Sequence, residues 1–456
     1  MTADVIIIGS GQAGAPLAYR LSRAAKRVIL FEGSALGGTC VNVGCTPTKT
    51  FIASADAAHW ARRGPEFGVE TGEVRIDMAA VVARKNKIVE MWRSGVERNV
   101  EKHAENLTLV REHARLLGPG LVGAGGEEYR ADTIIVNVGL RPSVPPIPGL
   151  EQVPYLTNED VMDLAEVPDH LIVLGGGYIG CEFGQAYRRF GAEVSIVDLA
   201  DHLIPREDHD VTETLAEVFE QEGIRLHLGA RAERIEATDA GVRVHLEGSG
   251  VIDGSHLLVA VGRAPNTDSL GCDETGVELD QRGYIVVDDH YHTSVPGIYA
   301  VGDVTGGPLF THASWDDHRI LFDLLEGNQR RTRKDRLVPS TAFTDPQLAR
   351  VGLTEREAEE AGLDYEVATM PFGRVARAVE TRQPSGMMKV LVDPDTEKIL
   401  GAVILGAQAG ELIHIFSMIM QAGATLQTIV DAEMVHPTFA EGLQTLVMRL
   451  DRYALS

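Results

Sequence analysis

Two cysteines five residues apart are the part of the sequence best suited to chemistry. Cys40 and Cys45 stand in LGGTCVNVGCTPTKT, close enough to form a disulfide once the backbone bends. A small ring strains such a disulfide, and strained disulfides are easily reduced. Lys49 lies four positions after Cys45, so a helix would place both on one face, where the cation lowers the thiol pKa. We therefore expect a redox-active pair.

A structural disulfide and a metal site are the alternative interpretations of this pair. The chain has 4 cysteines, and the other two, Cys181 and Cys272, stand alone in the sequence. In a reducing compartment a close pair favours redox or metal chemistry over a structural bridge. Zinc would require more soft ligands nearby, and the sequence has no second cysteine pair. Redox chemistry is favoured, and no metal site is predicted.

A histidine and a carboxylate near the C-terminus could exchange protons. VHPTFAEGL contains His436 and Glu441. Histidine suits proton transfer near neutral pH, and a carboxylate can fix its tautomer. The chain has 15 histidines, and pairs such as His290 and His292 are expected to be ordinary surface residues.

Two stretches of similar pattern must position these groups. DVIIIGSGQAGAPLAYRLSRAAKRVILFE and HLIVLGGGYIGCEFGQAYRRFGAEVSIVD each predict a buried strand, a glycine turn, an amphipathic helix and a second strand ending in a carboxylate. Such units form parallel sheets with helices on their faces. The sequence therefore predicts an α/β fold with two Rossmann-like dinucleotide-binding domains.

The first stretch has the features of a pyrophosphate site. Gly9 makes the tight turn, Gly11 lets the backbone approach the pyrophosphate, and Gly14 lets the helix pack closely on the strand. Glu32 follows roughly 20 residues later, where a carboxylate should meet a ribose hydroxyl. A lone glycine turn would be weak evidence, but here the full context occurs twice.

The second stretch repeats the pattern with Gly175, Gly177, Gly180 and Asp198. An acidic residue at this position favours a free 2′-hydroxyl and repels a 2′-phosphate. No basic residue follows Asp198 until Arg206. We predict a preference for NADH over NADPH.

Length and charge limit the class of protein. At 456 residues the chain exceeds one hydrophobic core, so two or more domains are expected. A formal charge of −24 and a pI near 5.0 make binding to nucleic acid or anionic membrane unfavourable. No apolar run approaches the roughly 20 residues that span a bilayer, and the chain opens directly with a strand. We expect a cytoplasmic protein without membrane or nucleic-acid partners.

Taken together, the motifs resemble the flavoprotein disulfide reductases, the family of glutathione reductase, dihydrolipoamide dehydrogenase and mercuric reductase. GSGQAG resembles the FAD motif, GGTCVNVGCTPTK the active-site helix, and GGGYIGCEFG the nicotinamide-nucleotide motif. VGRAPNT, TSVPGIYAVGD and HPTFAE match further motifs in the family order. The resemblance extends from end to end of the chain.

The resemblance implies a pyridine nucleotide-disulfide oxidoreductase that uses FAD and NAD(P)H. Electrons would pass from nicotinamide to flavin and then to Cys45, with Cys40 attacking the substrate. His436, oriented by Glu441, would act from the other subunit of a homodimer, and its bond to the next proline would be cis. Cofactor contacts are further implied for Gly38, Thr39, Lys49, Gly139, Glu182, Gly262 and Asp303.

The domain organisation follows from the same resemblance and from two breaks, RPSVPPIPG and GNQRRTRKDRLVP. We predict an FAD domain at 1–150, an NAD(P) domain at 151–267, a central segment at 268–337 that completes the FAD domain, and an α+β dimerisation domain at 338–456.

The chain also departs from the family pattern. Asn137, Val138 and Gly139 replace the usual Ala-Thr-Gly. The chain has neither the terminal vicinal cysteines nor the extra N-terminal domain typical of mercuric reductases, and His436 stands where those enzymes usually have tyrosine. Even so, GPLFTHASWDDHRI and FAEGL resemble the mercuric-reductase-like branch.

Three functions remain open. The leading hypothesis is an NAD(P)H-dependent reductase of a disulfide or of a soft metal ion such as mercury or copper. Dihydrolipoamide dehydrogenase is the alternative, favoured by His436, Glu441 and Asp198. A flavin-bearing redox sensor is a third, which would not need the complete dithiol and base. A transhydrogenase without a disulfide is disfavoured because both thiols are present.

Overall fold

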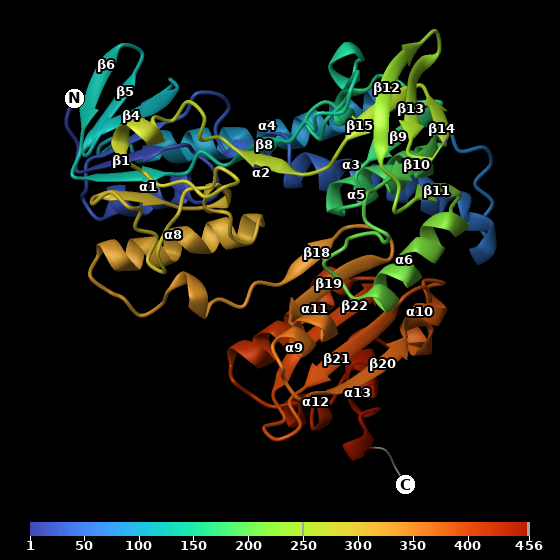
Figure 1. The fold of residues 1–456 in the computed structure, drawn as a ribbon. Coiled ribbons are helices and arrows are strands. Elements are labelled where there is room, and N and C mark those ends of the chain that lie inside the picture. Colours follow the sequence, from blue (N-terminus) through green and yellow to red (C-terminus); the bar gives the residue numbers. More distant parts are fainter. Residues whose placement is uncertain (249, 454–456) are drawn as a thin grey trace.

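The first nucleotide motif folds into a five-stranded parallel sheet in the order β17-β7-β1-β2-β3. The computed structural model describes residues 1–248 and 250–453. The strands are β1 (Val5–Ile8), β2 (Val28–Phe31), β3 (Leu107–Val110), β7 (Thr133–Val136) and β17 (Ile298–Ala300). The apolar run VIII of β1 is buried throughout, as expected of a central parallel strand. A late segment of the chain thus completes the edge of an N-terminal sheet (Figure 1).

Helices cover one face of this sheet and a small antiparallel sheet covers the other. The helices are α1 (Gly14–Arg23), α4 (Met78–Lys102) and α8 (Thr311–Leu325). The small sheet contains β4 (Ala114–Gly118), β5 (Leu121–Ala124) and β6 (Glu127–Arg130), with α7 (Cys272–Thr275) packed against β4.

The second motif repeats this design. Its parallel sheet has the order β11-β10-β9-β15. The strands are β9 (His170–Leu174), β10 (Glu193–Val197), β11 (Ile224–His227) and β15 (His256–Val259), and the helices α5 (Tyr178–Phe190) and α6 (His209–Gln221) pack on them. The opposite face is covered by β12 (Ala232–Thr238), β13 (Gly241–Leu246) and β14 (Val251–Gly254).

Two connections join the nucleotide units. The short α2 (Gly38–Asn42) leads to α3 (Cys45–Arg62), which packs against α5 of the second unit. Phe51 of α3 contacts the rings of Phe183, Tyr187 and Phe190 at centroid distances of 5.1 to 6.2 Å. At the predicted proline-rich joint, β8 (Leu140–Pro142) pairs antiparallel with β16 (Arg263–Pro265).

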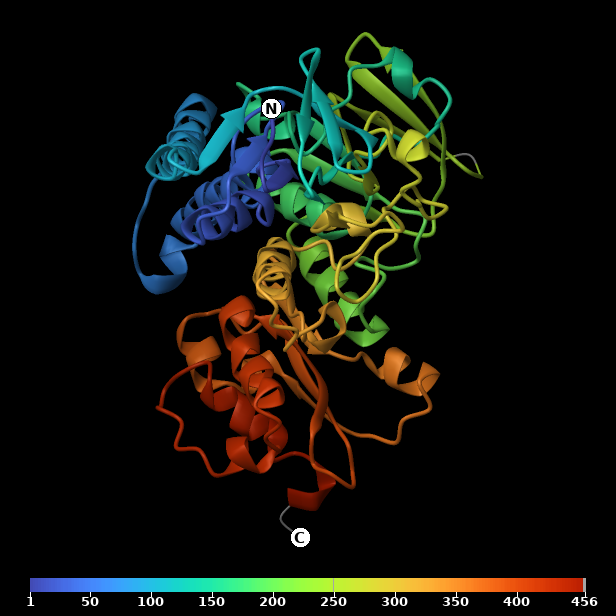
Figure 2. The ribbon, with the colours of Figure 1, turned by 90° about the vertical axis from the view of Figure 1, so that its left-hand side faces the viewer.

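The C-terminal part forms a separate antiparallel sheet in the order β18-β19-β22-β21-β20. It lies below the nucleotide units in Figures 1 and 2. Its strands are β18 (Ser340–Ala342), β19 (Gln347–Gly352), β20 (Glu366–Pro371), β21 (Met387–Val392) and β22 (Ile399–Gly406). Its helices are α9 (Glu355–Glu360), α10 (Ala376–Glu380), α11 (Ala409–Gln421), α12 (Gln427–Val430) and α13 (Glu441–Val447).

This architecture confirms the predicted fold class of two Rossmann-like units and a C-terminal α+β domain. The boundaries at residues 150, 267 and 337 stay predictions. Among the described helices, none combines the length and apolar character required to cross a bilayer.

Candidate active site

Most of the predicted site residues line one cavity of about 2110 Å³ between the nucleotide units. A typical small-molecule pocket measures roughly 300–1,000 Å³, so this cavity has room for two dinucleotides. The predicted residues that line it are Gly9, Gly11, Glu32, Gly38, Thr39, Cys40, Cys45, Lys49, Gly139, Gly175, Gly177, Glu182, Asp198, Gly262 and Asp303.

The glycines of the two fingerprints have matching geometry. Gly9 and Gly175 have φ angles of +101° and +110°, which residues other than glycine rarely adopt. A Cβ added to Gly14 would overlap the carbonyl oxygen of Gly9, and one added to Gly180 would overlap that of Gly175. Gly14 and Gly180 therefore serve close helix packing, as predicted from their spacing.

Both predicted ribose carboxylates are held by hydrogen bonds at the ends of their strands. Glu32 Oε2 accepts hydrogen bonds from the backbone N–H of Ser10 (3.0 Å) and from its hydroxyl (2.6 Å). Asp198 Oδ1 accepts from the N–H of Ala200 (2.8 Å), and Oδ2 accepts from that of Gly176. Each carboxylate thus has a fixed position in the cavity wall.

Asn137, which departs from the family pattern, joins three elements of the first unit. Its Oδ1 accepts a hydrogen bond from the N–H of Gly14 (2.9 Å), and its Nδ2 donates to the carbonyl of Val301 (3.0 Å). It therefore ties the first residue of α1 to the ends of β7 and β17. No role for Asn137 was predicted from the sequence, although a polar residue directly after a buried strand was a usable signal.

These residues fit FAD. The first turn of α1 offers backbone amides and the positive end of a helix dipole to a pyrophosphate. Glu32 lies where a carboxylate would bind a ribose hydroxyl. The same arrangement around α5 and Asp198 fits NAD(P)H.

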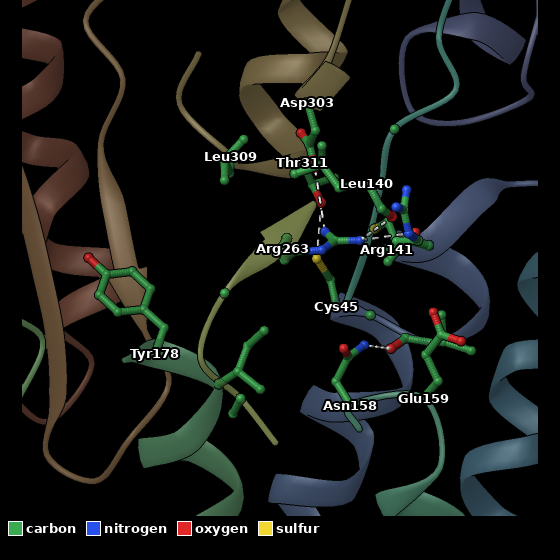
Figure 3. Close-up of a pocket in the computed structure, with 18 of the residues that line it drawn as sticks. Cys45, Leu140, Arg141, Asn158, Glu159, Tyr178, Arg263, Asp303, Leu309 and Thr311 are labelled. Atoms are coloured by element: carbon green, nitrogen blue, oxygen red, sulfur yellow. Dashed lines mark hydrogen bonds and ion pairs between the residues drawn. The ribbon is translucent and has the colours of Figure 1, made fainter. Parts of the chain in front are cut away.

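The Cys45 thiol lies where two helices begin. Cys45 is the first residue of α3, and its Sγ lies 3.0 Å from Oγ1 of Thr311, the first residue of α8 (Figure 3). Two positive helix ends therefore converge on Cys45, a setting that favours a thiolate.

The thiols have opposite acidities. A hydrogen bond from Cys40, with smaller contributions from Thr311 and Lys49, outweighs the effect of burial and lowers the pKa of Cys45 to about 6. The same hydrogen bond to Cys45, together with burial, raises the pKa of Cys40. In the reduced pair, Cys45 is the thiolate and Cys40 holds the proton.

Lys49 bridges the two nucleotide units at the cavity. Its Nζ donates to both carboxylate oxygens of Glu182, at 2.7 and 3.0 Å. The Glu182 side chain is 4% exposed and also accepts the N–H of Phe343 (2.8 Å). Lys49 therefore serves both as a cation near Cys45 and as the counterion of a buried carboxylate.

Arg263 and Asp303 extend this wall of the cavity. Arg263 donates to the carbonyl of Leu140 (2.8 Å) and lies 3.5 Å from the Asp303 carboxylate (Figure 3). Asp303 also accepts the Ser314 hydroxyl (3.0 Å), and burial raises its pKa. Arg263 and Thr311 stand in motifs that the sequence analysis quoted, but neither was singled out.

His436 and Glu441 form a pair outside the cavity. His436 Nδ1 lies 2.8 Å from Glu441 Oε2, and the His436 side chain is 71% exposed. The bond from His436 to Pro437 is cis, as expected. Neither residue is among those of the described chain that line the cavity, so one subunit does not bring this pair to its own dithiol.

Comparison with known proteins identifies the family. Residues 3–317 match the family described as pyridine nucleotide-disulphide oxidoreductase, and residues 338–447 match its dimerisation domain. The chain is 33% identical to a mercuric reductase of Lysinibacillus sphaericus over 453 residues, 98% of this chain and 83% of that protein. It is 34% identical to a dihydrolipoyl dehydrogenase of Thermus scotoductus over 468 residues, 100% of this chain and 98% of that protein.

A solved structure of a flavoprotein disulfide reductase has the same fold. The Cu(II) complex of the HOCl-induced flavoprotein disulfide reductase RclA from Escherichia coli superposes with a TM-score of 0.90 at 35% identity, covering 98% of this chain and 99% of that chain. The predicted family, enzyme class and cofactors are confirmed. The chain belongs to the pyridine nucleotide-disulphide oxidoreductases, which are enzymes that use FAD and NAD(P)H.

Proposed function

We propose that the protein passes electrons from NAD(P)H through FAD to a disulfide between Cys40 and Cys45, and from there to a disulfide or a soft metal ion. The supporting observation is that both thiols line the same cavity as the two dinucleotide fingerprints. Bound FAD supplies a centre that accepts a hydride from NAD(P)H and reduces a disulfide.

The chain stabilises the reduced dithiol through its own residues. Two electrons and one proton convert the disulfide into one thiol and one thiolate. The thiolate falls on Cys45, where Thr311 donates a hydrogen bond and Lys49 adds positive charge. The proton stays on Cys40.

Cys40 then needs a base, because it holds the shared proton. Once deprotonated, its sulfur bonds to one sulfur of the acceptor disulfide while the acceptor S–S bond breaks. The departing thiolate takes up the proton that the base removed. The Cys45 thiolate next attacks the Cys40 sulfur, which re-forms the internal disulfide and releases the second acceptor sulfur as a thiolate that takes a proton from solvent.

We assign the base to His436 of the second subunit in a homodimer. Its exposure, its place outside the cavity and the match of residues 338–447 to a dimerisation domain support this assignment. Glu441 would hold the tautomer with Nε2 free. Refolding H436A subunits together with C45S subunits tests this directly, because one site of each mixed dimer would be intact. Activity in the mixture and none in either parent is expected, and an inactive mixture would contradict a shared site.

Two classes of substrate are supported, a metal-ion electron acceptor and dihydrolipoamide as an electron donor to NAD. The relatives named mercuric reductase and the Cu(II) complex of RclA favour a soft metal ion, which thiolates bind well. The ordered His436–Glu441 pair and the relative named dihydrolipoyl dehydrogenase favour dihydrolipoamide.

The redox chemistry of a close cysteine pair also supports a cytoplasmic location.

An acceptor panel tests the proposal. NADH oxidation is measured with oxidised glutathione, lipoamide, mercuric ion and cupric ion, and NAD reduction is measured with dihydrolipoamide. C40S and C45S should retain FAD but turn over none of these substrates. C272A is the matched control, since Cys272 packs in the core of the first unit and does not line the cavity. Turnover in C40S equal to that of the unmodified enzyme would refute the proposal.

A further inference from the structure

The loop between β10 and α6 forms part of the second nucleotide site. Leu199, Pro205 and Arg206 of this loop line the cavity beside Asp198. Ile204 has a φ of +46°, a strained conformation for a β-branched residue, and its N–H donates to the carbonyl of Gly176 (2.9 Å). Such strain persists only where surrounding contacts impose it.

The C-terminal domain supplies several of those contacts. Arg356 of α9 donates to the carbonyls of Pro205 and Arg206, at 3.4 Å each. The Asp208 carboxylate, at the start of α6, accepts the N–H of Glu355 (3.1 Å). The cavity-lining end of the loop is therefore fastened to a different domain.

A buried lysine also links the start of α6 to the C-terminal domain. Lys389 of β21 is 1% exposed, and its Nζ lies 2.7 Å from Asp210 and 3.3 Å from Asp208, with Glu355 also in contact. These carboxylates could suggest a cation site, but the Lys389 ammonium group already contacts all three of them. The cluster is an ionic link between domains.

Glu207 connects this contact between domains to the glycine turn that precedes α5. Its side chain is 1% exposed, and its Oε2 lies 2.9 Å from Nε of Arg350 on β19. The hydroxyl of Tyr178 lies 3.5 Å from Glu207 Oε1. Arg350 is itself held by Glu357 at 3.1 Å.

Tyr178 carries the contact into the cavity. It is the first residue of α5, directly after Gly177 of the fingerprint, and it lines the cavity. Figure 3 shows its ring directed away from Cys45, toward the ribbons of the C-terminal domain. The Glu207 side chain therefore contacts Tyr178, and Glu207 directly follows the cavity-lining Arg206 in the chain. Arg350 is the counterion of Glu207.

We propose that Arg350 is a positioning residue for NAD(P)H, which acts through the Glu207 carboxylate to hold Tyr178 and the loop at residues 199–206 in the form that binds the dinucleotide. This inference rests on the proposed function, because it takes the second fingerprint to be the NAD(P)H site. It makes the dimerisation domain a determinant of affinity at a nucleotide site formed by another domain.

The test separates binding from chemistry. Holoenzyme is mixed anaerobically with increasing NADH, and flavin reduction is followed to obtain a dissociation constant and a limiting rate. R350M should weaken NADH binding about tenfold with a limiting rate close to that of the unmodified enzyme. R350K keeps the charge and should restore most of the affinity. E207Q should weaken NADH binding to the same extent as R350M. The double variant R350M/E207Q should bind NADH no more weakly than either single variant.

R452M is the matched control. Arg452 is a similarly enclosed arginine of the C-terminal domain that pairs with Glu366 and Glu397, and it has no contact with the loop among the described hydrogen bonds and ion pairs. Equal weakening in R452M, or a reduced limiting rate with unchanged affinity in R350M and E207Q, would overturn the proposal. Failure of the unmodified enzyme to oxidise NADH or NADPH would instead refute the proposed function.

Discussion

The Sγ of Cys45 lies 3.0 Å from the Oγ1 of Thr311, although 266 positions separate the two residues. The contact exists because α3 and α8 begin at the same place in the cavity. It gives the thiolate a hydrogen-bond donor that does not titrate in the working pH range.

Replacing Thr311 by valine removes that donor at nearly constant volume. The pKa of Cys45 is lowered to about 6, so the thiolate is present above that pH and is lost as the pH falls through it. A hydrogen bond to a charged group contributes roughly 1.5–3 kcal/mol, so T311V should raise the midpoint by about one pH unit or more. Thiolate absorbance of the reduced enzyme, titrated against pH, measures this. T311S should behave as the unmodified enzyme, and an unchanged midpoint in T311V would show that Thr311 is not a donor.

Replacing Lys49 by methionine leaves the Glu182 carboxylate buried without its counterion. The expected loss is about 2–3 kcal/mol in the free energy of unfolding of the region containing α3 and α5. Urea unfolding followed by tryptophan fluorescence is suitable, because Trp60 lies on α3. K49M/E182Q should recover part of the loss, since the unpaired charge is gone. A double variant less stable than K49M would contradict this explanation.

Replacing Asn137 by alanine removes both hydrogen bonds that join α1 to β7 and β17. We expect FAD to bind about tenfold more weakly, because a loss of about 1.4 kcal/mol corresponds to that factor. Quenching of FAD fluorescence on titration of the apoprotein gives the dissociation constant. N106A is the control, since Asn106 bonds to Ser22 in the same unit but does not line the cavity. Equal FAD affinity in N137A and the unmodified protein would contradict the assigned role.

We predict that Asp198 sets the preference between NADH and NADPH. The unmodified enzyme should show a higher kcat/KM with NADH than with NADPH, because the carboxylate repels a 2′-phosphate. In D198S the ratio of the two kcat/KM values should fall at least about tenfold, since Arg206 and Arg231 line the same cavity and would then attract the phosphate. D201S, an exposed change in the same loop, should leave the ratio unaltered. A preference of the unmodified enzyme for NADPH would refute the role of Asp198.

Local spacing was sufficient to predict the fingerprints and the dithiol. Gly9, Gly14 and Glu32 take part in one βαβ unit, so their separations along the chain determine their positions in the fold. The lysine four positions after Cys45 is likewise a neighbour on one helix. Such relationships follow from secondary structure alone.

Contacts between distant segments could not be predicted in this way. Thr311 reaches Cys45 only because a late segment of the chain folds back onto the first unit. Arg350 reaches Glu207 across 143 positions only through the packing of separate domains. Asn137 was noted as a departure, but its two partners come from α1 and the end of β17. The neighbours of His436 in a dimer depend on a second chain, which one sequence does not describe.

Anaerobic titration of the oxidised holoenzyme with a reductant tests the central claim most directly. Flavin and dithiol each store two electrons, so the unmodified enzyme should take up about four electrons per FAD, and C45S about two. Uptake of about two electrons by both proteins would show that Cys40 and Cys45 store none, and would contradict the proposed transfer.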